Sequence, residues 1–305
     1  MDAELLTGFL AAAVRVATPL LLAALGETMA ERGGVINLGI EGAMLGGALA
    51  AAIGAAHGGV WGGTLAACAA GIAVAAVFAL IVIRARADQI ITGTAMTLGM
   101  VGLTGAINRQ AFGAAGVGLT LPTFPAWSIP GLAAIPVIGP AFFRQSVLTY
   151  LAFLLAPISW WLLYRTRFGL ELRATGESAH HSRAAGVRVE LVRTGGVLLG
   201  GALAGLAGAS LVLAQVGTFA EKMTAGRGFM AIAIVVLGAW NPLRVFGAAL
   251  FFGGAMALQF LFQALGLGVP YQLFLMLPYL LTLATLAGAW GRTAAPSDLG
   301  RTEER

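Results

Sequence analysis

The sequence predicts an all-α, polytopic membrane protein with about nine transmembrane helices. Of its 305 residues, 59% are hydrophobic and only 10% are charged, and the mean hydropathy is +0.89. Soluble domains carry about 25% charged residues, so this chain cannot cover a soluble surface. These observations exclude a disordered chain, a disulfide scaffold and a cytosolic enzyme.

Nine apolar segments approach the roughly 20 residues that a spanning helix needs. They cover residues 5–26, 35–56, 60–83, 89–107, 146–164, 194–215, 228–240, 245–266 and 270–290. The first follows two acids rather than a basic stretch, which favours a retained helix over a signal peptide. The 13 residues of 228–240 make only about 20 Å of helix. That segment is either a tilted helix or a broken helix buried in protein.

The basic residues between the spans predict the orientation. With the C-terminus in the cytoplasm, 13 arginines fall in cytoplasmic segments, and four basic residues fall outside. This positive-inside preference puts the N-terminus outside for nine spans. Arg15 lies within the first span, where we expect it to have a partner, to snorkel or to face the protein interior. The outer connection 108–145 is proline-rich and is either an ordered loop or a hidden re-entrant piece.

An internal repeat predicts how the helices are grouped. The hexapeptide Leu-Gly-Gly-Ala-Leu-Ala occurs at 45–50 and again at 199–204, although an Ala- and Gly-rich composition alone is an alternative explanation. With the predicted topology, the match indicates one helix followed by two parallel four-helix halves, about 35–164 and 194–290. All belong to a single transmembrane domain over 1–305. Parallel repeats of this kind place a transport path between the halves.

Asn37 and Glu41 form the most informative polar pair inside an apolar run. At positions i and i+4 they are expected on one helical face, and an ionisable group there normally faces a bundle interior or a cavity. They either line a translocation path or tie neighbouring helices together. The predicted path adds Gly226 and Phe229 from the interrupted segment and Gln259 from the next span.

The sequence contains no catalytic or metal-binding pattern. Cys68 is the only cysteine, the three histidines are in loops, and no Gly-rich phosphate loop ending in Gly-Lys-Ser/Thr is present. We therefore expect no catalytic residue, no metal and no cofactor. The positive net charge follows from orientation signals and does not indicate a nucleic-acid partner.

Segment 165–193 is the only long cytoplasmic connection. It is either a charged loop that fixes orientation or a docking surface for a cytoplasmic partner. Its middle is expected to form a short helix bounded by Gly176 and Gly186, with Ser178 as the cap.

Four ordered blocks resemble permease subunits of ABC importers for sugars, nucleosides and branched-chain amino acids. Leu-Arg-Ala-x-Gly-Glu at 172–177, followed by Ala-Ala-Gly-Val at 184–187, resembles the coupling loop of that family. The blocks at 17–27, 31–42 and 226–242 are similar to its nucleoside and simple-sugar branch. Many relatives carry Asn-Pro after the Gly-Glu of the loop, whereas this chain continues Ser-Ala-His-His.

The resemblance implies an importer subunit in the bacterial plasma membrane. It would work with a second permease subunit, identical or different, with ABC ATPase subunits that bind the ATP, with an extracytoplasmic substrate-binding protein and with membrane lipid. Alternative functions are a branched-chain amino-acid permease and an ion-coupled secondary transporter, for which only Glu41 would serve as a coupling acid. Contact with the ATPase is expected at Arg173, Ala174, Gly176, Glu177, Ala185 and Gly186.

Overall fold

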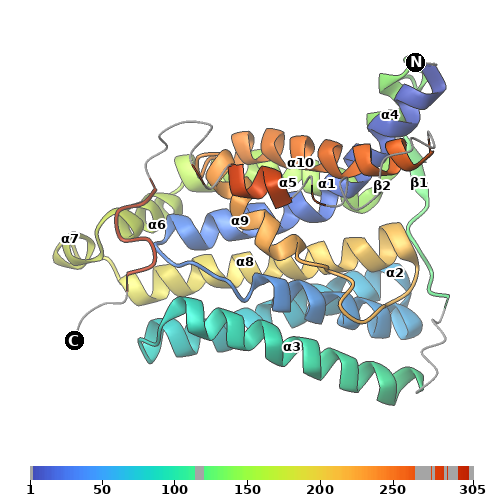
Figure 1. The fold of residues 1–305 in the computed structure, drawn as a ribbon. Helices are drawn as coiled ribbons and strands as arrows, with labels where there is room; N and C mark the ends of the chain where they lie inside the picture. The colour runs from blue at the N-terminus through green and yellow to red at the C-terminus, as the bar shows by residue number, and fades with distance from the viewer. Residues whose placement is uncertain are drawn as a thin grey trace.

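The computed structural model describes residues 3–113, 120–264, 276, 279–284, 287 and 295–301, which form a helical bundle with one small sheet (Figure 1). Within these residues, six helices are long and apolar enough to cross a membrane. The predicted span 270–290 lies largely outside the described residues, so the count of nine and the two-repeat grouping stay predictions. The six spans are Glu4–Arg32, Ile40–Arg84, Gln89–Ala111, Val147–Arg165, Val189–Val216 and Pro242–Gln259.

The first part of the bundle contains three helices. They are α1 (Ala3–Arg32), α2 (Ile40–Ala79) with a π-helical extension η1 (Leu80–Arg84), and α3 (Gln89–Phe112). Asp88 caps α3, because its Oδ1 accepts hydrogen bonds from the N–H groups of Ile90 and Ile91 at 2.9 and 2.8 Å.

Helix α2 reverses at Gly58 and Gly59, which have non-helical backbone angles. A Cβ added at Gly54 would lie 2.8 Å from the Cβ of Ala66, and one at Gly63 would lie 2.6 Å from the Ala51 carbonyl oxygen. Residues 12 apart in a straight helix are about 18 Å apart. The two arms of α2 are therefore antiparallel and correspond to the two predicted spans 35–56 and 60–83.

The outer connection is an ordered loop within residues 120–145. It contains β1 (Ala126–Ser128), the 3₁₀ turn η2 (Leu132–Ala134), α4 (Ile138–Phe143) and β2 (Arg144–Ser146), and the two strands pair antiparallel. Tyr150 joins the parts, since its hydroxyl donates to the Trp127 carbonyl and accepts from the Gln145 N–H.

The second part of the chain supplies the remaining helices. They are α5 (Val147–Arg165), α6 (Arg167–Glu177), α7 (Ala179–Ala184), α8 (Val189–Leu211) with the π-helical extension η3 (Val212–Val216), α9 (Arg227–Leu237) and α10 (Pro242–Ala264). Helix α9 has 11 residues and begins only at Arg227. This matches the broken-helix alternative for 228–240.

Helices α2 and α8 pack backbone to backbone. A Cβ added at Gly47 would lie 2.6 Å from the Cα of Gly205, and one at Gly208 would overlap the Met44 carbonyl oxygen. Small residues permit this close approach. The two hexapeptide copies pack on other segments: Gly47 on Gly205, Gly201 on Gly71 and Gly200 on Gly26. No path for a solute runs along these contacts, because helices in backbone contact leave no room for one.

The ends of the bundle differ. Helices α6 and α7 lie at one end together with the 295–301 segment, and the start of α1 lies at the other end with α4 and the sheet (Figure 1). The start of α1 and the 295–301 segment therefore lie at opposite ends, as an odd number of crossings requires, and which end faces the cytoplasm stays a prediction.

Candidate functional site: the α2–α9 junction and an outer cavity

The Glu41 carboxylate joins the start of α2 to the start of α9. Its side chain is buried, at 6% exposure. Oε1 accepts hydrogen bonds from the Thr224 hydroxyl at 2.6 Å and the Gly226 N–H at 2.8 Å, and Oε2 accepts from the Gly228 N–H at 2.6 Å.

These contacts place an internal anion at a helix N-terminus. The first N–H groups of a helix lack intrahelical acceptors and carry the positive end of the helix dipole. Gly226, the residue before α9, has the left-handed conformation, with φ +81°. In this conformation its own N–H and that of Gly228 both reach Glu41. The sequence left two alternatives for Glu41: it lines a translocation path, or it joins neighbouring helices. These hydrogen bonds favour the second alternative, and a direct part in translocation stays a prediction.

Asn37 corrects one expectation. Because α2 begins only at Ile40, Asn37 lies in the non-helical segment 33–39 and does not share a helical face with Glu41. Figure 1 shows this segment running back along the bundle from the end of α1. Asn37 is 3% exposed, its Oδ1 accepts the Gly39 N–H, and its own N–H donates to Glu27 Oε1 at 2.8 Å. Its contacts fix the entry into α2.

The other predicted path residues are more open. Phe229, on α9, is 40% exposed, and Gln259 is half-buried near the end of α10. No hydrogen bond joins Gln259 to Asn37 or Glu41. The structure therefore brings Asn37, Glu41 and Gly226 into one neighbourhood, with Phe229 following Gly228 on α9. Gln259 is apart from them, because it lies six residues beyond Gly253, which packs on Ala13 and Ala17 of α1.

Two family-like blocks that are about 200 residues apart meet at the end of α1. The Trp240 indole N–H donates to Glu31 Oε2, and the Arg32 Nε donates to the Trp240 carbonyl at 2.8 Å. Trp240 and Ala239 both have φ of +53°, a conformation that is uncommon for residues other than glycine. Glu31 and Arg32 hold the turn between α9 and α10 in this shape.

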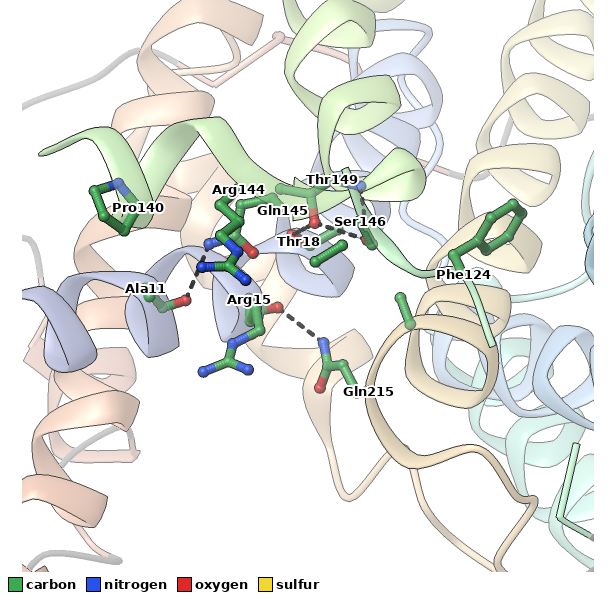
Figure 2. Close-up of a pocket in the computed structure, with 12 residues that line it drawn as sticks. Ala11, Arg15, Thr18, Phe124, Pro140, Arg144, Gln145, Ser146, Thr149 and Gln215 are labelled. Carbon is green, nitrogen blue, oxygen red and sulfur yellow. Dashed lines mark hydrogen bonds between the residues drawn. The ribbon is translucent and has the colours of Figure 1, made fainter. Parts of the chain in front are cut away.

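A cavity of about 320 Å³ opens at the other end of the bundle (Figure 2). Its polar floor comes from α1, β2 and α5: the Thr18 hydroxyl donates to the Thr149 hydroxyl at 3.1 Å, and Ser146 Oγ lies 3.1 Å from the same oxygen. Gln215 closes one side, where its Nε2 donates to the Arg15 carbonyl at 2.8 Å. The lining residues are Ala11, Arg15, Thr18, Phe124, Ala126, Pro140, Arg144, Gln145, Ser146, Thr149, Ala214 and Gln215.

Two exposed guanidinium groups, those of Arg15 and Arg144, belong to this cavity. Among the described residues, neither has a carboxylate within salt-bridge distance, so the expected partner of Arg15 is not found there. Arg32 follows 17 residues after Arg15, about 26 Å along the helix. Arg15 therefore lies near the outer boundary of a hydrocarbon core of about 30 Å, where a charge meets water. The sequence analysis did not identify Arg144 as a site residue. Its position in the connection 108–145 was the one feature of the sequence that set it apart.

The α6–α7 element at the opposite end confirms the short helix capped by Ser178, whose Oγ accepts the His181 N–H at 3.3 Å. Gly176, expected at a helix boundary, instead lies inside α6 and packs on the Arg32 carbonyl. Arg173 packs on the Tyr164 ring, and Ala174 is half-buried. The predicted docking residues that face outward are Glu177, Ala185 and Gly186.

Comparison with known proteins identifies the family. The model of a family described as the permease component of the branched-chain amino acid transport system matches residues 9–286. The chain belongs to this permease family. It is 37% identical to a guanosine ABC transporter permease of Bacillus subtilis, covering 97% of this chain and 96% of that one. It is 34% identical to a nucleoside ABC transporter permease of Lactococcus lactis, covering 92% and 91%.

A third relative has a different named substrate. The chain is 39% identical to a provisionally named glucose ABC transporter permease of Haloferax volcanii, over 98% of both chains. The family and the six apolar helices make this chain a membrane-embedded permease subunit of an ABC transporter, not itself an enzyme.

Proposed function

We propose that this permease imports nucleosides, with simple sugars as the second candidate class. Two full-length relatives are named for guanosine and nucleosides, and one is named for glucose. The outer cavity is the structural observation that carries the proposal, because it offers a volume of about 320 Å³ in the range of small-ligand sites.

The lining of the cavity suits a neutral, hydroxyl-rich solute. Thr18, Ser146 and Thr149 supply hydroxyls, and Arg15 and Arg144 supply paired N–H donors. The Phe124 ring adds an apolar wall for a base or sugar face. A branched-chain amino acid also needs an acidic partner for its ammonium group, and none of the lining residues is an acid. We propose this cavity as the outer entrance of the path.

The remaining machinery belongs to partner subunits. We propose that ATP is bound and hydrolysed by ATPase subunits that contact the exposed face of α6–α7, and that an extracytoplasmic binding protein delivers the solute. A second permease subunit completes the channel. Asn37, Glu41 and Gly226 hold the interrupted helices in position. Phe229, next to the Glu41 junction, and Gln259, near the end of α10, are the other residues of the predicted lining.

The substrate proposal is tested by uptake into proteoliposomes that contain the permease with its ATPase and binding protein. ATP-dependent uptake of labelled guanosine is expected. Uptake of glucose alone favours the second candidate, and uptake of leucine alone overturns both. In the Arg15→Gln variant the rate is expected to fall severalfold. Arg109→Gln is the matched control, because Arg109 is also exposed but pairs with Glu221 outside the cavity.

The docking proposal is tested by Glu177→Lys. Glu177 is exposed and its Oε2 accepts from the exposed Ser297 hydroxyl, so reversing its charge is expected to leave the helices intact. ATPase binding is therefore the readout that separates docking from the contact with Ser297. ATPase binding and uptake are expected to fall while the amount of inserted permease stays normal. Enlarging Gly176 is a poorer test, because a Cβ there would overlap the Arg32 carbonyl and disturb the fold itself. Unchanged ATPase binding in Glu177→Lys would place the docking surface elsewhere.

A further inference from the structure

The segment 295–301 returns to the cytoplasmic end of the bundle and lies beside α6 (Figure 1). The Asp298 N–H donates to the Gly176 carbonyl at 2.9 Å, and the Gly300 N–H donates to the Gly34 carbonyl at 3.2 Å. The Ser297 hydroxyl donates to Glu177 at 3.1 Å. A short piece of chain thus touches both α6 and the loop that follows α1.

The Asp298 carboxylate is the centre of these contacts. Its Oδ2 accepts the N–H of Ala179, the first residue of α7, at 2.7 Å, and lies 4.0 Å from the Arg193 guanidinium on α8. The Asp298 side chain is 22% exposed, so the contacts are partly shielded from water. Helix α7 has only six residues, too few to be stable without contacts from outside.

Arg193 extends the connection to the first half of the chain. It is 6% exposed, its Nε donates to the Gly33 carbonyl at 2.9 Å, and its Nη2 donates to the Thr175 carbonyl at 3.2 Å. Asp298 and Arg193 therefore join the loop after α1, the end of α6 and the start of α7.

The far side of the segment reaches α3. The Arg301 carbonyl accepts from Gln89 Nε2 at 3.4 Å, and Gln89 Oε1 accepts the Ile36 N–H at 2.8 Å. Ile36 belongs to the segment that leads into α2, and Gln89 begins α3. A displacement of α7 thus has a hydrogen-bonded route to the loop 33–39 and from there to the Glu41 junction.

We propose that residues 295–301 form a latch that transmits movement of α6–α7 to the loop 33–39, with Asp298 as its positioning residue. The inference rests on the proposed contact between α6–α7 and the ATPase. When the ATPase moves α7, Asp298 transmits the movement to Arg193, and Gly300 in the same segment transmits it to Gly34. The transmembrane helices then move with α7. Without the carboxylate, α7 moves alone and ATP is hydrolysed without transport.

The test measures solute transported per ATP hydrolysed in proteoliposomes that contain the complete complex. The solute is guanosine or glucose, whichever the wild type takes up. Asp298→Ala is expected to lower the ratio by about fivefold or more while hydrolysis continues. Asp298→Glu, which keeps the charge, is expected to restore part of it. Arg301→Ala is the matched control, because its side chain is 74% exposed and its 3.9 Å pairing with Asp298 is weak.

An unchanged ratio in Asp298→Ala overturns the latch. If that variant does not fold, Asp298→Asn replaces it, since the amide oxygen still accepts the Ala179 N–H but the charge facing Arg193 is lost. A smaller loss than in Asp298→Ala is expected, because the contact with Ala179 remains while the pairing with Arg193 is lost, and an unchanged ratio again overturns the proposal.

A second measurement is independent of the partners. Hydrogen exchange of the Ala179 amide in the purified permease is expected to be faster in Asp298→Ala than in Arg301→Ala, and equal rates overturn the latch. If the wild-type permease binds no ATPase, the proposed function is contradicted. The exchange measurement does not depend on that outcome, because it tests only the contact between Asp298 and Ala179 in the permease alone.

Discussion

The ionisable side chains at the two ends of the bundle differ in burial and in their hydrogen-bond partners. At the α2–α9 junction and at the end of the bundle that carries α6 and α7, Glu31, Glu41 and Arg193 are buried, and each is hydrogen-bonded to a backbone or indole group. At the outer cavity, Arg15 and Arg144 are exposed and lack a carboxylate partner among the described residues. A buried charge that is already satisfied holds the fold, whereas an exposed charge without a partner is free for a ligand.

The largest expected effect is at Glu41. Glu41→Ala leaves the amides of Gly226 and Gly228 and the Thr224 hydroxyl without their acceptor. Each buried donor left without an acceptor costs about 1–3 kcal/mol, and three donors are affected here. We expect a large drop in the unfolding temperature in detergent, with Glu41→Gln intermediate because its amide retains one acceptor oxygen. A wild-type unfolding temperature for Glu41→Ala would contradict the structural role.

A smaller loss is expected at the turn between α9 and α10. Trp240→Phe keeps most of the ring and removes the N–H that donates to Glu31. Leaving the buried Glu31 oxygen without its donor costs about 1–3 kcal/mol, and the unfolding free energy should fall by that order. The control is Trp161→Phe on α5, whose side chain is 57% exposed. Equal effects of the two substitutions would remove the distinction between buried and exposed sites.

The smallest effect on stability is expected at the cavity. The double variant Arg15→Gln, Arg144→Gln should change the unfolding free energy by no more than about 0.5 kcal/mol, because exposed substitutions rarely do more. Its uptake rate should nevertheless fall below that of either single variant. If the double variant is destabilised as much as Trp240→Phe, the two arginines stabilise the fold. The distinction between buried, hydrogen-bonded groups and exposed cavity groups would then be wrong.

Much of the organisation was predictable because its causes are local. Continuous apolar runs define spanning helices, and the described spans agree with the predicted ones to within a few residues at most ends. Ser178 was predicted as a cap because a serine hydroxyl needs only an amide three residues away. The short α9 followed from the length of its apolar run and the glycines before it.

The sequence by itself determined the membrane class, the position of most spans and the blocks that resemble the permease family. Only the tertiary structure decided which groups Asn37 and Glu41 contact and that Arg144 lines a cavity. Asn37 lies outside α2 because a turn anchored on Glu27 delays the helix start to Ile40. Glu41 joins α2 to α9 because it meets amides more than 180 residues away. Contacts at such separations depend on how the helices pack, and no local pattern of residues encodes them.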